Sequence, residues 1–452
     1  MENYSDELFI SKLSTLTKTN DPIDPSLYQT FDVKRGLRNT DGRGVLVGLT
    51  KIGDVVGYEM VNNQKVAVPG KLYYRGYDVE KIIEDSEKNN QFGFEQIIYL
   101  LIFGELPTKD QLEEFRLYIG RNRELPSFFT EDMIMKAPSP DIMNKLARGV
   151  LASYSYDKTP ESTNLENIIR QCLELIARFP SLVANGYQAK RRYYDGQSMF
   201  IHFSDPNIST AENFLRLIRS DSQYTRLEAE LLDLALILHA EHGGGNNSSF
   251  TVHVVSSTDT DTYSAIAAAV GSLKGKRHGG ANLQVMKMMD ELKKNVKDWS
   301  SEKQVREYLE KIVRKEAGDG SGLIYGMGHA IYTISDPRAV QLKRKAEQLA
   351  KEKGCLEEFN LYNLIEKLSP SVLYDIKKTN KRFCANVDLY SGFVYTMLNI
   401  PRELFTPIFA ISRVAGWSAH RIEEAVAGGR IYRPAYKNIL EPREYVPMSK
   451  RN

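Results

Sequence analysis

Apolar residues recur every three or four positions through most of the chain, which is the pattern of amphipathic helices. Residues 1 to about 35 already have this helical character. The stretch from Gly44 to Tyr77 instead contains short runs rich in β-branched residues. These runs are Val45–Thr50, Val55–Met60 and Lys65–Pro69, with Gly53-Asp54 and Asn62-Asn63 between them. We therefore expect three short strands joined by turns.

Capping signals and prolines divide the remaining chain into helices. Ser301 to Gln304 has the form of a capping box and predicts a helix through Ile312. Asp259 to Thr262 can cap an alanine-rich helix that contains Ala265 to Ala269. Helices are expected to stop at five prolines, which are Pro107, Pro138, Pro180, Pro370 and Pro401. The pattern as a whole predicts a mainly α protein with a small β element near the N-terminus.

Length and charge narrow the class of protein. A chain of 452 residues with 42% apolar residues can bury a large core, and its length favours two domains. Lys and Arg number 60 against 58 Asp and Glu, so the basic excess typical of nucleic-acid-binding proteins is absent. The three cysteines, Cys172, Cys355 and Cys384, form no disulfide framework or CxxC pattern, which fits a reducing compartment.

The chain has no sequence feature of a membrane protein. Its longest apolar stretches, around Ile97 to Phe103 and Ala265 to Val270, are far shorter than the roughly 20 residues of a membrane-spanning helix. The first eight residues are acidic and resemble no targeting peptide. We expect a soluble, cytoplasmic protein that binds neither membranes nor nucleic acid.

Histidines beside glycines mark the candidate chemistry. His239 and His242 lie three apart on one helical face, but Glu241 between them does not make an HExxH motif. His253 lies in an expected helix without a Cys, Asp or Glu cluster in the nearby sequence, so no metal site is predicted. His242 opens the loop Gly243-Gly-Gly-Asn246 and is expected to contact a ligand, whereas His239 is expected to be a core histidine.

Two further segments combine histidine with groups that stabilise negative charge. In Lys276-Arg-His278-Gly-Gly-Ala-Asn282, a neutral imidazole at a helix junction can donate to a developing oxyanion. In Gly326-Met-Gly-His329 to Asp336-Pro-Arg338, a histidine precedes an arginine whose planar fork matches a carboxylate. Neither segment has the glycine spacing of a dinucleotide or nucleotide phosphate loop.

Together these segments resemble the citrate synthases, in the branch that includes the 2-methylcitrate synthases. The resemblance covers about Asp41 to Pro434 and several motifs in the same order. The motifs are Leu72–Asp78, His239–Ser249, the His278 segment, His329–Arg338, Asn386-Val-Asp-Leu-Tyr-Ser-Gly392, Ser412-Arg413 and Arg433-Pro434. Met327, Lys276, Ala330 and Thr333 differ from the residues that are usual in the family.

The resemblance implies a role for each residue of a carbon–carbon bond-forming site. Asp388 would take a proton from the methyl group of acetyl-CoA, while His278 stabilises the enol that forms. His329 would polarise the ketone of oxaloacetate and protonate the new alkoxide. The implied carboxylate ligands are His242, Arg338, Arg413 and, from a neighbouring subunit, Arg433. Asn246 and Ser248 would orient the histidines.

The resemblance also implies contacts to coenzyme A, a domain division and an assembly. The implied coenzyme A residues are Leu323, Ile324, Tyr325, Gly326, Met327, Gly328, Lys381 and Arg382. A large helical domain would comprise residues 1–282 and 389–452, and a small helical domain residues 283–388, with the site between them. The expected protein is a homodimer with shared active sites that needs no metal or redox cofactor.

Three other functions stay open at this point. A 2-methylcitrate synthase would use propionyl-CoA in the same mechanism, and one methylene is worth only roughly 1–3 kcal/mol of discrimination. A non-catalytic paralogue that binds coenzyme A or carboxylates would not need Asp388, His278 and His329 together. A metallohydrolase built on His239 and His242 is the most distant alternative. The main expectation is an acyltransferase of the tricarboxylic acid cycle that makes citrate and free coenzyme A from acetyl-CoA, oxaloacetate and water.

Overall fold

The computed structural model describes residues 6–40, 42–62, 64–379 and 381–451. The chain divides into two units at Leu49/Thr50. The N-terminal unit contains α1 (Asp6–Asn20), α2 (Pro25–Thr30) and a 3-10 turn, η1 (Arg35–Leu37). Asp24 caps α2 by accepting a hydrogen bond from the Ser26 N–H at 2.9 Å. The expected helical character of the first 35 residues is confirmed over the part of that segment that the structure describes.

A three-stranded antiparallel sheet opens the second unit, in the order β1 (Gly53–Val61), β2 (Gln64–Tyr74) and β3 (Tyr77–Asp78). The two later predicted strands are confirmed, and the first is wrong, because Val45–Thr50 forms no strand and has no partner strand. Leu46 and Leu49 are 85% and 91% exposed, so the alternation of apolar residues there did not indicate a buried face.

Of the two turns predicted in this region, the one at Gly53-Asp54 is wrong. Gly53 and Asp54 are the first residues of β1, paired with β2, and do not form the predicted turn. Asn62 has a positive φ of 50°, as a tight hairpin turn requires, whereas Asn63 lies outside the described residues.

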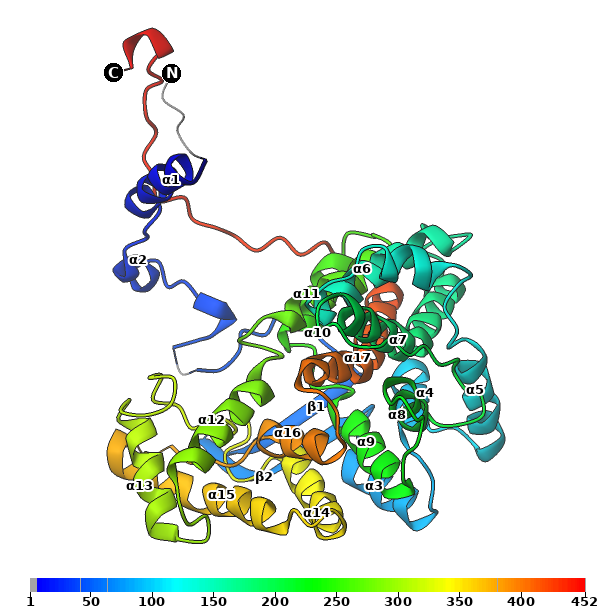
Figure 1. Ribbon diagram of the computed structural model, residues 1–452. Coiled ribbons are helices and arrows are strands. Elements are labelled where there is room, and N and C mark those ends of the chain that lie inside the picture. Colours follow the sequence, from blue (N-terminus) through cyan, green and yellow to red (C-terminus); the bar gives the residue numbers. More distant parts are fainter. Residues whose placement is uncertain (1–5, 41, 63, 380, 452) are drawn as a thin grey trace. The chain divides into compact units, whose positions relative to one another are not determined.

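Helices make up most of the second unit (Figure 1). The first of them are α3 (Val79–Lys88), α4 (Phe94–Phe103), α5 (Lys109–Arg121), α6 (Ile142–Ser153), α7 (Leu165–Tyr193), α8 (Thr210–Ile218), α9 (Arg226–His239), α10 (Asn247–Ser256) and α11 (Thr262–Lys274). They are followed by α12 (Ala281–Asn295), α13 (Glu302–Val313), α14 (Pro337–Glu352), α15 (Leu356–Lys377), α16 (Val387–Met397) and α17 (Phe405–Ala427). Short helical turns are η2 (Thr130–Met135), η3 (Tyr154–Tyr156), η4 (Arg402–Leu404) and η5 (Met448–Lys450). The prediction of a mainly α fold with a small sheet is confirmed.

The observed helix boundaries show which of the predicted caps and proline stops are correct. Asp261 caps α11, as predicted, and Ser301 caps α13. The second half of the predicted capping box is not formed, because the Gln304 side chain accepts from the N–H of Asp298 instead. Pro180 and Pro370 lie inside α7 and α15, so two of the predicted stops are wrong. Both prolines have buried neighbours on the same helix, and this packing compensates for the hydrogen bond that each proline removes.

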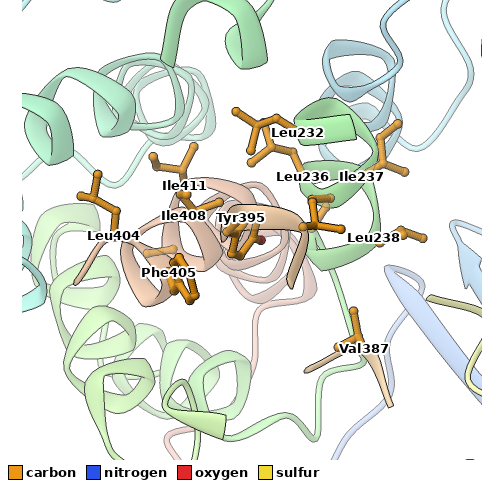
Figure 2. Packing of buried hydrophobic residues seen from close by; sticks show 14 of the residues in the cluster. Leu232, Leu236, Ile237, Leu238, Val387, Tyr395, Leu404, Phe405, Ile408 and Ile411 are labelled. Atoms are coloured by element: carbon orange, nitrogen blue, oxygen red, sulfur yellow. The ribbon is translucent and has the colours of Figure 1, made fainter. Parts of the chain in front are cut away.

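Helix α17 is the centre of the core. It packs against α7, α10, α11, α4 and α9, and most of its side chains are buried, including Trp417 at 0% exposure. Figure 2 shows its residues Ile408 and Ile411 packed near Tyr395 of α16 and Leu236 of α9. The central helix therefore carries Arg413 into the interior of the protein. The predicted boundary between domains 1–282/389–452 and 283–388 stays a prediction.

A buried glycine in α5 gives the first testable prediction. A Cβ at Gly120 would lie 2.0 Å from the backbone carbonyl oxygen of Pro206, so Gly120→Ala must displace backbone. We expect it to lower stability by about 1–3 kcal/mol, the usual cost of overpacking, and to lower the midpoint of thermal unfolding. Gly271→Ala in α11 is the matched control, because no atom lies within 4 Å of its Cβ. There the better helix propensity of alanine should leave the midpoint equal or higher. Equal midpoints for the two variants would contradict the described packing.

Candidate active site

Most of the candidate side chains lie at helix ends. His242 lies between α9 and α10, His278 lies between α11 and α12, and Asp388 is in the first turn of α16. Arg338 is in the first turn of α14, and Arg413 reaches the group from the middle of α17. Burial lowers the pKa of His242, and the positive charges of Arg338 and Arg413 lower it further. The charge of Arg413 also acts on His278, and that of Arg338 acts on His329 and Asp388, so these side chains lie within electrostatic reach of the two arginines and are treated as one cluster.

His242 and His329 face each other through their Nε2 atoms, 3.1 Å apart. Nδ1 of His329 accepts hydrogen bonds from the backbone N–H groups of Ile331 at 3.1 Å and Tyr332 at 3.2 Å, so the ring proton is on Nε2. The Tyr332 ring stacks on His329 at 4.7 Å between centroids. Burial, with Arg338, lowers the pKa of His329 to about 4. At neutral pH, His329 is thus a neutral donor with a fixed tautomer.

Arg338 is held by the carboxylate of Asp336. Nε and one terminal nitrogen of the guanidinium donate to the two carboxylate oxygens at 3.0 and 2.8 Å, and both residues are buried. Asp336 also caps α14 by accepting from the Arg338 N–H and accepts from the N–H of Val387 at the start of α16. This carboxylate was not predicted as a site residue, although Asp before Pro at a helix start is a known capping signal.

Arg413 is buried, and only one of its three guanidinium nitrogens has a hydrogen-bond partner among the described residues. Its Nε donates to the carbonyl oxygen of His239 at 2.6 Å, but both terminal nitrogens lack a hydrogen-bond partner among the described residues. Burial lowers the pKa of Arg413 to about 10, against the opposing effect of Glu241. The guanidinium lies over the Phe409 ring at 4.7 Å. Since a buried charge without partners is costly, the two free nitrogens indicate a place for an anion.

Asp388 is a half-buried carboxylate with a raised pKa. Burial raises its pKa from 3.8 to about 6, although Arg338 opposes this effect. Its backbone N–H donates to the side chain of Asn386, the N-cap of α16, at 3.0 Å. The carboxylate can therefore accept a proton near neutral pH, which is the property of a general base.

His278 is connected to a buried serine. Its Nε2 lies 3.0 Å from Oγ of Ser248, which also accepts from Nε1 of Trp417 at 3.0 Å and lies 3.0 Å from Oδ1 of Asn246. Burial and Arg413 lower the pKa of His278 to about 4. Ser248 thus contacts His278 directly, and Asn246 acts through Ser248.

The loop from Gly326 to Gly328 is bound to the segment before Asp388. The carbonyl oxygen of Gly326 accepts from the N–H of Asn386 at 2.9 Å, and that of Gly328 accepts from the Asn386 side chain at 2.8 Å. Gly326 has a φ of 82°, and a Cβ there would lie 2.9 Å from Cα of Leu389. Glycine is therefore required at this position, and Asn386 joins the His329 segment to the Asp388 helix.

The predicted coenzyme A residues lie in two places. Leu323 is exposed, Ile324 is buried in the core, and Tyr325 donates to the side chain of Asp319 at 2.6 Å. Lys381 and Arg382 are exposed and line a cavity of about 490 Å³. The other residues of this cavity include Thr333, Ile334, Tyr374 and Phe383. Two positive charges beside an apolar cavity suit a ligand with phosphate groups and an apolar part.

Two other predicted residues have different surroundings. His239 is buried, and its Nδ1 lies 2.8 Å from the carbonyl oxygen of Ala235, as expected of a core histidine. Arg433 is exposed in the extended segment that follows α17, and no hydrogen bond joins it to the described residues of the cluster. Its predicted role in a neighbouring subunit's site stays a prediction.

The fold gives His253 partners that its neighbouring sequence does not supply, and the prediction that no metal binds here stays a prediction. Its Nδ1 lies 2.8 Å from Oε2 of Glu424, and its Nε2 lies 3.0 Å from Nδ1 of His420. His253, His420 and Glu423 each offer one possible ligand atom within 4.8 Å of the others. His253 lies about 170 positions from His420 and Glu423 in the chain, so no local pattern could have predicted the group.

Comparison with known proteins decides the family. The family model described as citrate synthase, C-terminal domain, matches residues 36–435. The chain belongs to the citrate synthase family.

Curated relatives carry both names that the sequence suggested. The citrate synthase of Synechocystis sp. is 34% identical over 84% of this chain and 88% of that protein. The 2-methylcitrate synthase of Shewanella oneidensis is 32% identical over 90% of this chain and 98% of that protein. Members of this family are synthases of the transferase class, so the chain is an enzyme of that kind.

Solved citrate synthases share the fold. That of Pyrobaculum aerophilum is 30% identical, with a TM-score of 0.74 over 90% of this chain and 94% of its own. That of Thermoplasma acidophilum, solved as a ternary complex with carboxymethyl coenzyme A and oxaloacetate, is 26% identical with a TM-score of 0.75. Over the described residues of our chain, no helix is long and apolar enough to cross a membrane.

The double role of Asn386 generates a second prediction. Asn386→Ala should remove the cap of α16 and release the Gly328 carbonyl, whereas Asn164→Ala should remove the cap of α7 and an exposed local bond to Ser162 but, among the described residues, no contact to another segment. Both should cost about 1 kcal/mol of capping energy. Hydrogen exchange measured by mass spectrometry should become faster in peptides that contain residues 326–328 only in the Asn386 variant. Unchanged exchange there would mean that Asn386 does not hold the loop.

Proposed function

We propose that the enzyme condenses acetyl-CoA with oxaloacetate and water to give citrate and free coenzyme A. The observation that carries this proposal is the unsatisfied guanidinium of Arg413 in the same cluster as the raised-pKa carboxylate of Asp388. The first provides a buried place for a carboxylate, and the second provides a base for a weak carbon acid.

The first step removes a proton from the methyl group of the thioester. Asp388 takes the proton, and the enol oxygen receives a hydrogen bond from His278. This role needs Ser248 to give its single proton to Nε2 of His278 rather than to Asn246, because the ring proton then lies on Nδ1 and can be donated. A neutral donor suits this step, since the pKa of His278 is about 4 and the ring carries no charge at neutral pH.

The second step forms the carbon–carbon bond. Nε2–H of His329 donates to His242 in the empty site, and the ketone oxygen of oxaloacetate would replace that acceptor. The enol carbon attacks the polarised ketone, and His329 gives its proton to the alkoxide. The backbone bonds to Nδ1 keep this proton on Nε2 before the reaction.

Arg413 and Arg338 would both bind carboxylates of oxaloacetate, but they differ in the number of donors they have available. Arg413 offers two unpartnered nitrogens, whereas Arg338 offers only the donors that Asp336 leaves unused. His242 completes the set in one chain, and Arg433 of a second subunit would add another cation, so we propose a homodimer. We place the phosphate end of coenzyme A at Lys381 and Arg382.

The last step hydrolyses the citryl thioester. Exclusion of water until this point would protect the intermediate, and the predicted two-domain division would allow such closure. These steps are a proton transfer, an addition to a ketone and a thioester hydrolysis with no net redox change, and the proposed mechanism assigns no metal or redox cofactor to them. We propose that the enzyme works in the cytoplasm, in the tricarboxylic acid cycle.

Similarity to a 2-methylcitrate synthase supports the second candidate, with propionyl-CoA as the acyl donor. The test is release of coenzyme A thiol with acetyl-CoA and with propionyl-CoA at equal oxaloacetate. A higher kcat/KM for acetyl-CoA supports citrate synthesis, and the reverse order supports 2-methylcitrate synthesis. No thiol release with either would support the non-catalytic paralogue, and loss of activity on chelation would support metal-dependent chemistry.

The raised pKa of Asp388 predicts a particular pH profile. The protonated acid cannot act as a base, so log kcat/KM for oxaloacetate, which reports on the enzyme before oxaloacetate binds, should rise with pH at a slope near one below about pH 6 and level off above it. An exposed aspartate would place the break near 3.9. Asp388→Asn should lower turnover by about 10²-fold or more while oxaloacetate still binds. Near-normal turnover in this variant would reject the assignment.

A further prediction concerns the geometry of the hydrogen-bond donors of Arg413 rather than its charge. Arg413→Lys keeps a positive charge but loses the two parallel donors, so the KM for oxaloacetate should rise by about tenfold or more. The KM for acetyl-CoA should change little. Arg451→Lys, an exposed arginine in the C-terminal segment, serves as the control. An effect on acetyl-CoA alone would move Arg413 to the coenzyme A site.

A further inference from the structure

A row of four ionisable side chains lies behind the turn that carries His242. His253 comes from α10, His420 and Glu424 come from α17, and Glu241 immediately precedes His242. Nδ1 of His253 is 2.8 Å from Glu424, and Nε2 of His253 is 3.0 Å from Nδ1 of His420. Nε2 of His420 is 3.1 Å from Oε1 of Glu241. Three consecutive hydrogen bonds thus join two carboxylates through two imidazole rings.

Counting protons gives the charge of the histidine pair. An ionised carboxylate can only accept, so with Glu424 and Glu241 ionised, Nδ1 of His253 and Nε2 of His420 each carry a proton. The hydrogen bond between the two rings needs a third proton on one of the facing nitrogens. Two neutral imidazoles have only two N–H groups between them. The pair of His253 and His420 therefore holds one excess proton and one positive charge.

The surroundings favour His420 as the charged ring. The carboxylates nearest the pair are Glu241, Glu423 and Glu424. Oε2 of Glu423 lies 3.7 Å from Nδ1 of His420 and has no hydrogen-bond partner among the described residues. Burial alone lowers the pKa of His420, but Glu241 and Glu423 raise it to about 9. Burial and the charge of His420 lower the pKa of His253.

Glu241 connects this pair to the active-site cluster. Its Oε1 also accepts a hydrogen bond from the backbone N–H of Gly243, on the far side of His242 in the sequence. A Cβ at Gly53 would lie 2.7 Å from Cγ of Glu241, and one at Gly416 would lie 2.4 Å from its Oε2. The side chain is therefore confined between β1 and α17. The charges of Arg413 and Arg75 also act on Glu241.

We propose that the His253–His420 pair, holding one proton, positions Glu241 and through it the turn that presents His242 to the substrate. His420 and Glu241 are positioning residues, because neither touches the reacting atoms. The role of His242 as a ligand of oxaloacetate rests on the proposed function. The charge on His420 keeps Glu241 ionised, so that Glu241 can hold the Gly243 amide.

A bound metal ion is the competing explanation of the same geometry. His253, His420 and Glu423 could supply three ligands, and the other nitrogen of each histidine already contacts a carboxylate, as in many zinc sites. A metal would replace the shared proton between the rings. The two explanations therefore differ in whether N–H protons or a metal occupy this position.

The first experiment measures protonation without any use of activity. The protein is labelled with ¹⁵N-histidine, and the ring resonances are assigned with single variants and recorded between pH 6 and 10. We expect both ring nitrogens of His420 to be protonated at pH 7.5. Neutral rings throughout at pH 7.5 would overturn the proposal. About one equivalent of zinc in elemental analysis, lost in His253→Gln, would overturn it in favour of the metal.

The second experiment tests the positioning role. In His420→Gln and in Glu241→Gln, the KM for oxaloacetate should rise about tenfold or more, as for loss of other supporting side chains, while the KM for acetyl-CoA stays unchanged. His202→Gln is the matched control, because among the described residues this half-buried ring has one hydrogen bond, to the carbonyl oxygen of Arg219 at 3.0 Å, and lies outside the row. Unchanged kinetics in both variants would overturn the proposal.

The two experiments distinguish failure of the proposed function from failure of the proposed role of the His253–His420 pair. If the unmodified enzyme released no coenzyme A thiol, the proposed function would fail, and the NMR titration would still decide the charge of the pair. If a variant failed to fold, the titration of the unmodified protein would still be able to overturn the proposal.

Discussion

Four N–H groups converge on the carboxylate of Asp336, and the site depends on this convergence. Three of them belong to Arg338 and the fourth to Val387, so one side chain fixes the starts of both α14 and α16. His329 lies before the first helix and Asp388 lies in the first turn of the second. An ionised carboxylate with this many donors is satisfied although it is buried, and it can set the spacing between a proton donor and a base.

The two arginines of the cluster differ in their partners: Arg338 is paired within the protein, and Arg413 is available to a ligand. Arg338 is neutralised by Asp336 and forms part of the framework, whereas Arg413 has two nitrogens with no partner in the described residues. Burial of such a group costs free energy that the folded core must offset. The surrounding helices supply that core, since α17 is buried along most of its length. A site for an anion is thus maintained by apolar packing around it.

Sequence alone predicted the helical class, the caps at Asp261 and Ser301, and the segments that bring His242, His329 and Asp388 together. These depend on local patterns or on motifs that keep their order. The errors have long-range causes. Val45–Thr50 has strand-like residues but no partner strand, and Pro180 is tolerated because its helix is buried on both sides. The contact of His420 with Glu241 joins residues 179 positions apart, and no spacing rule reports such a contact.

The raised pKa of Asp388 has a consequence for the order of events. A dicarboxylate that binds at Arg413 and Arg338 brings two negative charges close to a carboxylate that is already poorly solvated, and like charges raise the pKa of an acid further. The first substrate to bind would therefore strengthen the base that acts on the second. In the proposed reaction, the basicity of Asp388 would thus be set by the bound dicarboxylate, and proton abstraction from the thioester would be weak until that acceptor is present.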